Sequence, residues 1–469
     1  MRDYTRDSLS HDPIHGYIPF AARPADASAD EVTERQIVDH PWVQRLRQIH
    51  QLQTAWYVYP SAEHRRFQHV LGAMHLASRA IERLYPSLCE VCPDVPSQAC
   101  VESLTRLAAL LHDVGHGPFG HFFDDQYLSD FGLTHETLGQ KIIIDELGDM
   151  LRRVRRNPAG ELAEGEAIDP QQIAFLIARP KGEENDSAFP RWLVMLRALF
   201  CGIYTVDNMD FVLRDAYMSG YSAQSFDLDR LLHYSFFSER GLTIHSRGLP
   251  ALVRFISVRA ELFRTIYFHR TVRGIDLSLQ SLFAESKPYL FPGNPLEHLE
   301  AYQGFTDLSL LVDVARWPQS DDQKQRELGI AWRELLVNRK LRWRMACERT
   351  LFFDPLDKET SSIFSEAEFV EQRLRKLLPE QLRKMPLRID LARHVHRPFT
   401  SGPTAGQNFL YDAASNRIRT LEDHELVQRI PLSYRICRVY AETGDANSEL
   451  ATALDQLVGG PGEDSLTNM

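Results

Sequence analysis

Apolar side chains recur at intervals of three and four residues along most of this chain, with turn residues between the runs. That spacing places them on one face of a helix, so each run predicts an amphipathic helix. The predicted helices cover Val43 to Gln53, His69 to Leu84, Val101 to His112, Leu138 to Arg155, Arg191 to Phe200, Asp207 to Met218, Leu249 to Ser278 and Gln323 to Phe352. Such a succession of helices predicts a mainly α fold, a helical bundle.

The pattern changes near the carboxyl end of the chain. Phe399 to Gln407 is rich in glycine, threonine and proline, and Phe409 to Tyr411 and Asn416 to Thr420 are typical of short strands around a turn. We therefore expect a small α+β C-terminal appendage on the bundle. The expected division is a main domain over residues 1–330, a helical extension with a small mixed domain over 331–458, and a disordered tail over 459–469.

Composition agrees with a globular cytoplasmic enzyme. The 469 residues are 43% hydrophobic and 25% charged, with a net charge of -11. No apolar run reaches membrane-spanning length, and Met1 to Asp30 lacks the order of a signal peptide, so we expect no membrane partner. The acidic balance argues against general affinity for nucleic acid. The basic run Leu151 to Arg156 is either a solvated helix face or a local patch for a polyanion.

The first sign of chemistry is the pair His112-Asp113, which ends the apolar run Leu107 to Leu111. A buried histidine and aspartate without partners would be costly, so metal ligation or a polar network is required. Imidazole and carboxylate suit first-row divalent metals. His69 at the start of one predicted helix and Asp207 at the start of another complete a set of His69, His112, Asp113 and Asp207. The spacing also places Asp207, Asp210 and Arg214 on one helical face.

Several segments together are similar to one family. They are Asp12-Pro13-Ile14-His15-Gly16, Gln44 to Leu52, Arg66-Phe67-Gln68-His69, His112 to Phe119, His135-Glu136, Asp207 to Asp215, Asn416-Arg417-Ile418 and Arg438-Val439-Tyr440. The chain resembles the HD-domain phosphohydrolases, within them the deoxynucleoside triphosphate (dNTP) triphosphohydrolases, and the core of the vertebrate enzyme with a sterile alpha motif. That motif is not expected here, since the Asp-Pro-Ile-His-Gly segment lies close to the start.

The resemblance implies a reaction and a metal. In this branch a metal-activated water attacks the α-phosphorus and releases a deoxynucleoside and tripolyphosphate. The metal is a divalent ion, and ligand types alone leave iron, manganese, zinc, cobalt, nickel and magnesium open. The chain has no nucleophile elbow and no glycine-rich phosphate loop, which agrees with attack by water.

The resemblance also implies the residues around the metal. Proton transfer falls to His116, His121, Asp124 and His135, although a structural role remains the alternative for any single histidine. Substrate binding falls to Gln51, Leu52, Arg66, Asp215, Arg259, Tyr267, His269 and Arg270. Gln51 and Asp215 match the pair that reads the 3′ hydroxyl, while Leu52 and Tyr267 crowd the 2′ carbon and favour deoxyribose. Helix core is the alternative role for Leu52 and Tyr267.

A regulatory site is implied by resemblance alone. Asp39, Gln44 and Arg47 match residues that read a guanine base, and Arg230 matches a phosphate contact; helix salt bridges are the alternative for Arg47. GTP or a dNTP would then be an activator, bound between subunits of a homo-oligomer, a dimer or tetramer. The chain departs from the regulated relative at Asn208, where that relative has lysine after the metal aspartate, so triphosphate affinity is expected to differ.

The sequence leaves other assignments open. Cys89, Cys92 and Cys100 could suggest structural zinc, but an evident fourth ligand is missing nearby, and Cys201, Cys347 and Cys437 are expected to be buried thiols. The alternatives to a dNTP triphosphohydrolase are an HD phosphohydrolase for another phosphate ester, either a nucleotide monophosphatase or a phosphodiesterase, and a nucleotide sensor without catalysis.

Overall fold

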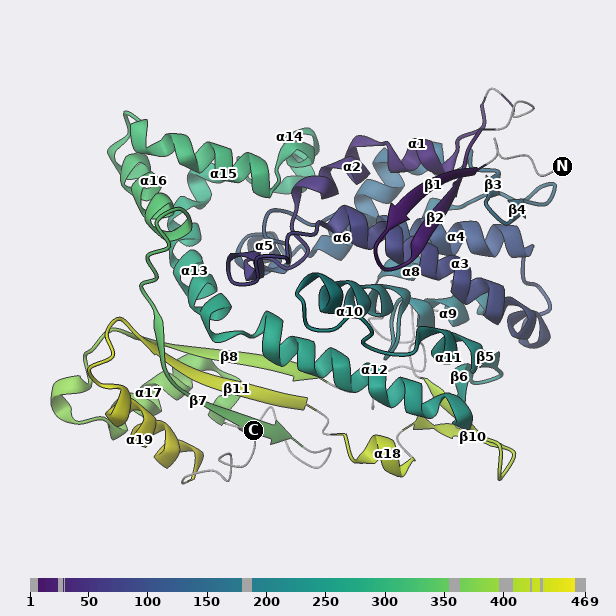
Figure 1. Ribbon diagram of the computed structural model, residues 1–469. Coiled ribbons are helices and arrows are strands. Elements are labelled where there is room, and N and C mark those ends of the chain that lie inside the picture. Colours follow the sequence, from purple (N-terminus) through teal and green to yellow (C-terminus); the bar gives the residue numbers. More distant parts are fainter. Residues whose placement is uncertain are drawn as a thin grey trace. The chain divides into compact units, whose positions relative to one another are not determined.

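The computed structural model describes residues 7–23, 28, 30–178, 188–353, 363–395, 408–421, 424–430 and 433–459. It is mainly helical with small sheets (Figure 1), as the spacing of apolar residues predicted. The expected tail, apart from Gly459, lies outside the described residues. No described helix combines the length and the apolar character needed to cross a lipid bilayer.

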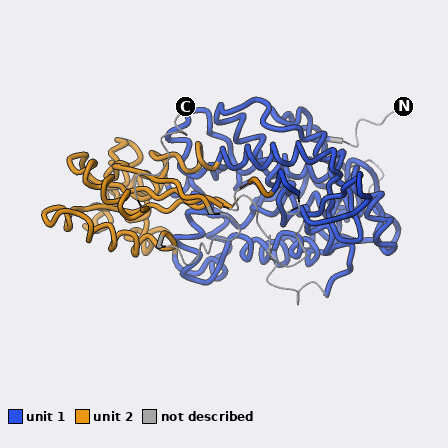
Figure 2. The backbone as a smooth tube through the Cα atoms, turned by 90° about the horizontal axis from the view of Figure 1, so that it is seen from below, with its two compact units in different colours: residues 1–262, 292–310, 399–427 blue, residues 263–291, 311–398, 428–469 orange. Residues whose placement is uncertain are grey.

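The chain forms two compact units, each built from three segments (Figure 2). Unit 1 holds residues 1–262, 292–310 and 399–427, and unit 2 holds residues 263–291, 311–398 and 428–469. The boundary expected at residue 330 does not separate these units. Residues 263–291 belong to unit 2, although they precede residue 330, and residues 399–427 belong to unit 1, although they follow it.

Unit 1 contains the long helices that carry the candidate chemistry. Its helices include α1 (Glu34–Val38), α2 (Pro41–Gln44), α3 (Arg66–Val91), α4 (Gln98–Leu111), α5 (His121–Gln126), α6 (His135–Lys141), α7 (Gly148–Leu151), α8 (Pro170–Ile177), α9 (Arg191–Leu196), α10 (Val206–Met218), α11 (Leu228–His233), α12 (Leu249–Leu262), α14 (Leu299–Gly304) and α18 (Glu425–Gln428). Its strands are β1 (Asp7–Asp12), β2 (Gly16–Ala21), β3 (Arg156–Asn157), β4 (Gly160–Glu161), β5 (Ser235–Ser238), β6 (Gly241–His245), β9 (Phe409–Asp412) and β10 (Arg417–Thr420).

Helix α3 is the centre of unit 1, because α4 and α10 both pack along it. Local sequence sets where these helices begin. At the start of α3, the backbone N–H of Arg65 donates to Gln68 Oε1 at 2.8 Å. Ser97 Oγ caps α4 and Thr205 Oγ1 caps α10, accepting from backbone N–H groups at 3.2 and 3.0 Å. The caps place His69 in the first turn of α3 and Asp207 in the first turn of α10.

A four-stranded sheet in unit 1 has the order β10-β9-β6-β5. Neighbours pair antiparallel except β6 and β9, which run parallel with Thr243 opposite Phe409. The predicted strands around residues 409–411 and 416–420 are thus present as β9 and β10. They join β5 and β6, which the spacing analysis had not identified.

Unit 2 is a three-stranded antiparallel sheet with helices. It contains α13 (Arg270–Leu290), α15 (Asp307–Arg316, shared with unit 1), α16 (Gln323–Leu336), α17 (Ala367–Leu377) and α19 (Asn447–Val458), with β7 (Arg344–Phe353), β8 (Leu387–Val395) and β11 (Ser433–Ala441) in the order β7-β11-β8. Its core joins Val370 and Leu374 of α17 with Leu450 and Leu454 of α19 and Val439 of β11. Unit 2 is thus the α+β part near the carboxyl end, although the two strands from which it was predicted, β9 and β10, belong to unit 1.

Several predicted helices end earlier than the apolar spacing suggested. The run 43–53 forms only α2 and a 3-10 turn (Arg45–Gln48), because Ile49 is extended and Gln53 has a φ of 49°. The run 323–352 stops at Leu336, and β7 follows because it pairs with β11. The runs 138–155 and 249–278 are interrupted by π turns at Ile142–Glu146 and Phe263–Tyr267. Conversely, α3 continues past Pro86 to Val91.

Candidate metal centre

Three side chains from three helices of unit 1 converge on one point. His69 comes from α3, His112 is the C-cap of α4, and Asp207 comes from α10. His69 Nε2 lies 3.3 Å from His112 Nε2 and 3.1 Å from Asp207 Oδ1, and His112 Nε2 lies 3.7 Å from the same oxygen. All three donor atoms lie within 4.8 Å of one another, a spacing at which one ion could contact each of them.

The hydrogen bonds on the far side of both rings fit a cation at this point. His112 Nδ1 lies 2.8 Å from the carbonyl oxygen of Ala109, which can only accept, so Nδ1 carries the proton. His69 Nδ1 lies 2.8 Å from Asp210 Oδ2 and donates in the same way. In the neutral rings, both Nε2 lone pairs then point at each other. This donor set, with each outer N–H anchored, is typical of histidines that bind metal.

The surrounding charges also favour a cation. Burial opposes the charged form of His69, but the carboxylates of Asp207 and Asp210 outweigh it and raise the pKa of His69 to about 10. Burial likewise opposes ionisation of Asp207, yet hydrogen bonds from His112 and His69 hold its pKa below the ordinary value. Without an ion, a proton on His69 therefore takes the place of the positive charge.

Asp113 stands beside the three converging donors. Its Oδ1 lies 3.3 Å from His112 Nε2, and its Oδ2 accepts from Arg66 Nη1 at 2.8 Å. Burial favours the neutral carboxyl, but His112, Arg66 and His116 keep its pKa well below the usual range. Asp113 is thus an anion that faces the centre while an arginine holds its other oxygen.

Gly120 leaves the room that Arg66 needs. A Cβ at this position would lie 2.3 Å from Arg66 Nη2, and its φ of 56° belongs to the left-handed region that glycine adopts freely. The guanidinium therefore lies under the turn that leads from the His112-Asp113 pair to His121. The positive charge of Arg66 therefore acts both on Asp113 of the centre and on His116 of the next cluster.

That next cluster consists of His116, His121, Asp124 and His135, whose donor atoms also lie within 4.8 Å of one another. Asp124 Oδ2 contacts His135 Nδ1 and lies 3.3 Å from His121 Nδ1. His116 and His135 are stacked with ring centroids 3.7 Å apart. His116 and His135 are buried, whereas the side chain of His121 is 63% exposed. The carboxylate thus orients two imidazoles, one of which faces solvent.

His116 connects the two clusters. Its Nε2 lies 3.3 Å from Asp113 Oδ1 and its Nδ1 lies 3.8 Å from Asp124 Oδ2. Burial, Arg66 and His135 together hold the pKa of His116 well below its ordinary value, so the ring is neutral. The three histidines and one aspartate expected to move protons therefore adjoin the expected metal ligand Asp113 through His116.

The residues expected to read the sugar also lie close together. The backbone N–H of Gln51 donates to the carbonyl of His64 at 3.1 Å, and His64 Nε2 lies 2.7 Å from Asp215 Oδ1. Gln51 Oε1 is buried and has no hydrogen-bond partner among the described residues. Leu52 is 6% exposed. Sequence reasoning missed His64, which joins the two polar residues; its position five residues before His69 was the only signal.

Arg259 lies in α12 and is buried. Its Nη1 donates to the carbonyl of Ile203 at 2.8 Å, and burial lowers its pKa to about 10 although Asp207 opposes this shift. Tyr267, His269 and Arg270 belong to unit 2, where His269 Nδ1 caps α13 by accepting from Thr271 N–H at 3.2 Å.

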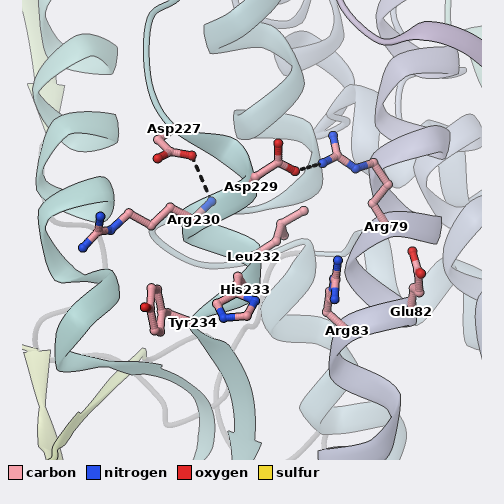
Figure 3. Close-up of a pocket in the computed structure, with 9 residues that line it drawn as sticks. All are labelled: Arg79, Glu82, Arg83, Asp227, Asp229, Arg230, Leu232, His233 and Tyr234. Carbon is pink, nitrogen blue, oxygen red and sulfur yellow. Dashed lines mark hydrogen bonds and ion pairs between the residues drawn. The ribbon is translucent and has the colours of Figure 1, made fainter.

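The residues expected to bind a regulatory nucleotide fall into two places. Asp39, Gln44 and Arg47 lie on or beside α1 and α2, and the Arg47 guanidinium stacks on Phe67 at 3.6 Å. Arg230 lines a separate pocket of about 430 Å³ between α3 and α11 (Figure 3). The pocket is lined by Arg79, Glu82, Arg83, Asp227, Asp229, Arg230, Leu232, His233 and Tyr234. Its arginines and acids balance in number, and Arg230 donates to the Arg247 carbonyl at 2.9 Å.

Two further features of the sequence have ordinary surroundings. Arginines of the basic run contact neighbouring groups: Arg152 pairs with Asp149 at 3.0 Å, and Arg156 pairs with Glu161 at 2.7 Å. Arg152 is exposed, as on a solvated face, whereas the Arg156 side chain is only 13% exposed and lies in β3, beyond the end of α7. Cys201, Cys347 and Cys437 are buried, as expected, and all six cysteines are free thiols. Among the described residues, the clusters of side chains that could hold a metal ion contain no cysteine.

Comparison with known proteins agrees with this geometry. Residues 66–175 match the model of the HD domain. The uncharacterized protein YwfO of Bacillus subtilis is 28% identical over 64% of this chain and 62% of its own length. The deoxynucleoside triphosphate triphosphohydrolase SAMHD1 homolog of Dictyostelium discoideum is 28% identical over 62% and 53% of the two chains. The human SAMHD1 is 24% identical over 93% and 71%.

The fold agrees as well. A crystal structure of a hypothetical protein from Aquifex aeolicus superposes with a TM-score of 0.65 at 21% identity, covering 96% of this chain and all of that one. The chain matches only 62% and 53% of the lengths of the Bacillus and Dictyostelium relatives. Together these findings show an HD domain over residues 66–175 and a similarity of the chain to the SAMHD1 triphosphohydrolases.

Proposed function

We propose that this protein hydrolyses deoxynucleoside triphosphates to deoxynucleoside and tripolyphosphate, with a divalent metal ion held by His69, His112, Asp113 and Asp207. The observation that carries the proposal is the convergence of three metal-binding donors 3.1 to 3.7 Å apart. The similarity to proteins named as triphosphohydrolases supports the choice of substrate class. When bound, such an ion activates water and polarises a phosphoryl oxygen.

The residues around the centre supply the other needs of this reaction. Arg66 and Arg259 are buried cations beside Asp113 and Ile203, and a guanidinium suits a phosphate because its charge and fork geometry are constant. Breaking the bond between the α-phosphorus and the 5′ oxygen leaves the deoxynucleoside with a 5′ oxygen that must gain a proton. His121 is solvent-exposed and is oriented by Asp124, so it can deliver that proton and recover it from water.

Sugar selection follows from two neighbouring residues. Gln51 Oε1 is an acceptor without a partner among the described residues, and a 3′ hydroxyl would donate to it. The adjacent Leu52 is apolar and offers nothing to a 2′ hydroxyl, so a ribose would lose a hydrogen bond to water without replacement. Both features favour deoxyribose. We also propose that an activator, GTP or a dNTP, binds at Asp39, Gln44, Arg47 and Arg230 of a homo-oligomer.

The proposal is tested by mass-spectrometric product analysis. Protein reconstituted separately with Mn²⁺, Co²⁺ or Fe²⁺ is offered each dNTP, with and without GTP. Asp207→Ala removes a donor, and Asp149→Ala is the matched control, since the Asp149 side chain is 97% exposed on α7. We expect deoxynucleoside and tripolyphosphate from the wild type and Asp149→Ala but not from Asp207→Ala.

Each other outcome points to one alternative. Orthophosphate or a cleaved linear nucleotide would identify an HD phosphohydrolase for another ester. Unchanged dNTPs with saturable binding would identify a nucleotide sensor. Product formation that survives in Asp207→Ala would contradict the metal centre.

A further inference from the structure

The carboxylate of Asp210 is fully buried and accepts four hydrogen bonds. Its Oδ1 receives His15 Nε2 at 2.7 Å and Arg214 Nη2 at 2.9 Å. Its Oδ2 receives His69 Nδ1 at 2.8 Å and Arg214 Nε at 2.9 Å. A carboxylate has about four acceptor positions, so Asp210 is saturated. Only one of its donors, His69, belongs to the proposed metal centre.

The other donors connect Asp210 to the hairpin at the start of the described chain. His15 lies in the turn between β1 and β2, and its side chain is 1% exposed. Asp12 Oδ1 accepts the backbone N–H groups of Ile14 and His15, both at 2.9 Å, which fixes the turn. Asp12 Oδ2 accepts Arg214 Nη1 at 2.8 Å. The Asp-Pro-Ile-His-Gly motif, whose role the proposed reaction leaves open, thus contacts α10 through two side chains.

Close packing of α3 against α10 fixes the position of the Asp210 carboxylate. Gly72 of α3 faces α10, and a Cβ there would lie 1.9 Å from Asp210 Oδ1 and 2.3 Å from Arg214 Nη2. Any other residue would push the carboxylate away from its donors. The close approach of the two helices is therefore what brings Asp210 within hydrogen-bond distance of His69.

We propose that Asp210 is a positioning residue for the metal centre, and that the Asp12 to Gly16 turn and Arg214 hold it in place. By accepting the Nδ1 proton of His69, Asp210 selects the tautomer whose Nε2 lone pair faces His112 and Asp207. Asp12, Asp210 and Arg214 together keep one net negative charge behind the ring, which strengthens Nε2 as a ligand. The inference rests on the proposed metal centre, and its test separates the two.

The experiment measures binding of Co²⁺ to the full chain after removal of metal. Calorimetry gives the affinity, and the visible absorption of Co²⁺ reports the ligand geometry. Asp210→Asn keeps the shape of the side chain but replaces one carboxylate oxygen by an amide nitrogen. His15→Gln removes the imidazole that donates to Asp210 and leaves His69 unchanged. Glu34→Gln is the matched control, because Glu34 is also a fully buried carboxylate paired with an arginine, Arg106, at 2.5 and 2.8 Å.

We expect Asp210→Asn to bind Co²⁺ about 10- to 100-fold more weakly with an altered spectrum. His15→Gln should fall between it and the wild type, and Glu34→Gln should bind like the wild type even where its melting temperature drops. A folded Asp210→Asn with wild-type affinity and spectrum would overturn the inference. Should Asp210→Asn not fold, wild-type behaviour of His15→Gln overturns it. Wild-type protein that binds no Co²⁺ would overturn the metal centre itself.

Discussion

His69 and His112 turn their Nε2 atoms toward each other at 3.3 Å while both Nδ1 atoms donate to fixed acceptors on the outside. Two lone pairs at this distance repel unless a positive charge lies between or beside them. The folded chain is therefore arranged for a cation, and the protein without one must use a proton.

Divalent metal should stabilise the folded protein through this pair. An ion that binds only the folded state adds about 2.7 kcal/mol at a free concentration of about 100 times Kd. We expect the melting temperature to rise with Co²⁺ or Mn²⁺ and to fall again with a chelator, measured by differential scanning fluorimetry. His112→Ala should abolish the rise. An equal rise in His112→Ala would place the ion elsewhere.

Binding of metal should release a proton at neutral pH. The pKa of His69 is raised to about 10 because Asp207 and Asp210 outweigh burial. Its proton therefore stabilises the metal-free fold fully below the unfolded value near 6.5, and that stabilisation is lost as the pH rises toward 10. At pH 8 we expect about one proton to leave per ion.

The proton is counted by calorimetry of Co²⁺ binding in buffers with different ionisation enthalpies. The apparent binding enthalpy should change in proportion to the ionisation enthalpy of the buffer. Metal-free protein should also lose stability between pH 7 and pH 10. A binding enthalpy that is the same in every buffer would contradict a protonated His69.

Asp124 should matter for turnover more than for binding. It contacts His135 and His121 through one oxygen, so Asp124→Asn would leave both imidazoles without their orienting charge. We expect kcat to fall about 100-fold with a small change in KM and a shifted pH profile. The neighbouring Asp125→Asn, on the exposed side of α5, is the control. Equal effects of the two variants would argue against a role in proton transfer.

His75 should lower the stability of the folded protein at acid pH. Burial and the positive charges of His15, Arg79 and Arg106 lower the pKa of His75 to about 4, although Asp12 opposes the shift. Because the unfolded value is near 6.5, the folded state binds a proton less readily, and stability falls as the pH drops from 6.5 toward 4.

Chemical denaturation at pH 7.5 and pH 5 measures this effect. His75→Gln cannot take up the proton, so it should lose less stability between these two pH values than the wild type. His233→Gln, at an exposed histidine, should lose as much as the wild type. If His75→Gln loses as much as His233→Gln, the acid sensitivity belongs to other groups.

The metal donors were accessible to sequence analysis because each lies at a helix end that the sequence marks. His112 ends an apolar run, and Asp207 follows Thr205, a residue that commonly caps helices. Asp210 and Arg214 were placed on the same face as Asp207 by spacing alone. Helical periodicity therefore predicts which residues share a face, whereas the convergence of His69, His112 and Asp207 depends on how three separate helices pack.

The contacts between distant segments were not accessible in the same way. The role of His15 depends on a partner 195 residues later, and no local pattern predicts that pairing. Strand β7 was assigned to a helix because its apolar positions also fit helical spacing, while its actual state depends on β11, where Arg349 lies opposite Cys437. Such elements are decided by tertiary pairing rather than by local preference.

The chain passes between its two compact units five times, and β6 pairs with β9 across more than 160 residues, from Thr243 to Phe409. During synthesis, the sheet of unit 1 cannot close until β9 has left the ribosome, so β6 waits with one unpaired edge while most of unit 2 is being made. A contiguous fragment that holds the metal ligands but ends before β9 would keep that edge open. Expression of such a fragment is therefore expected to favour aggregation, so experiments on this centre need a chain that extends at least through β9.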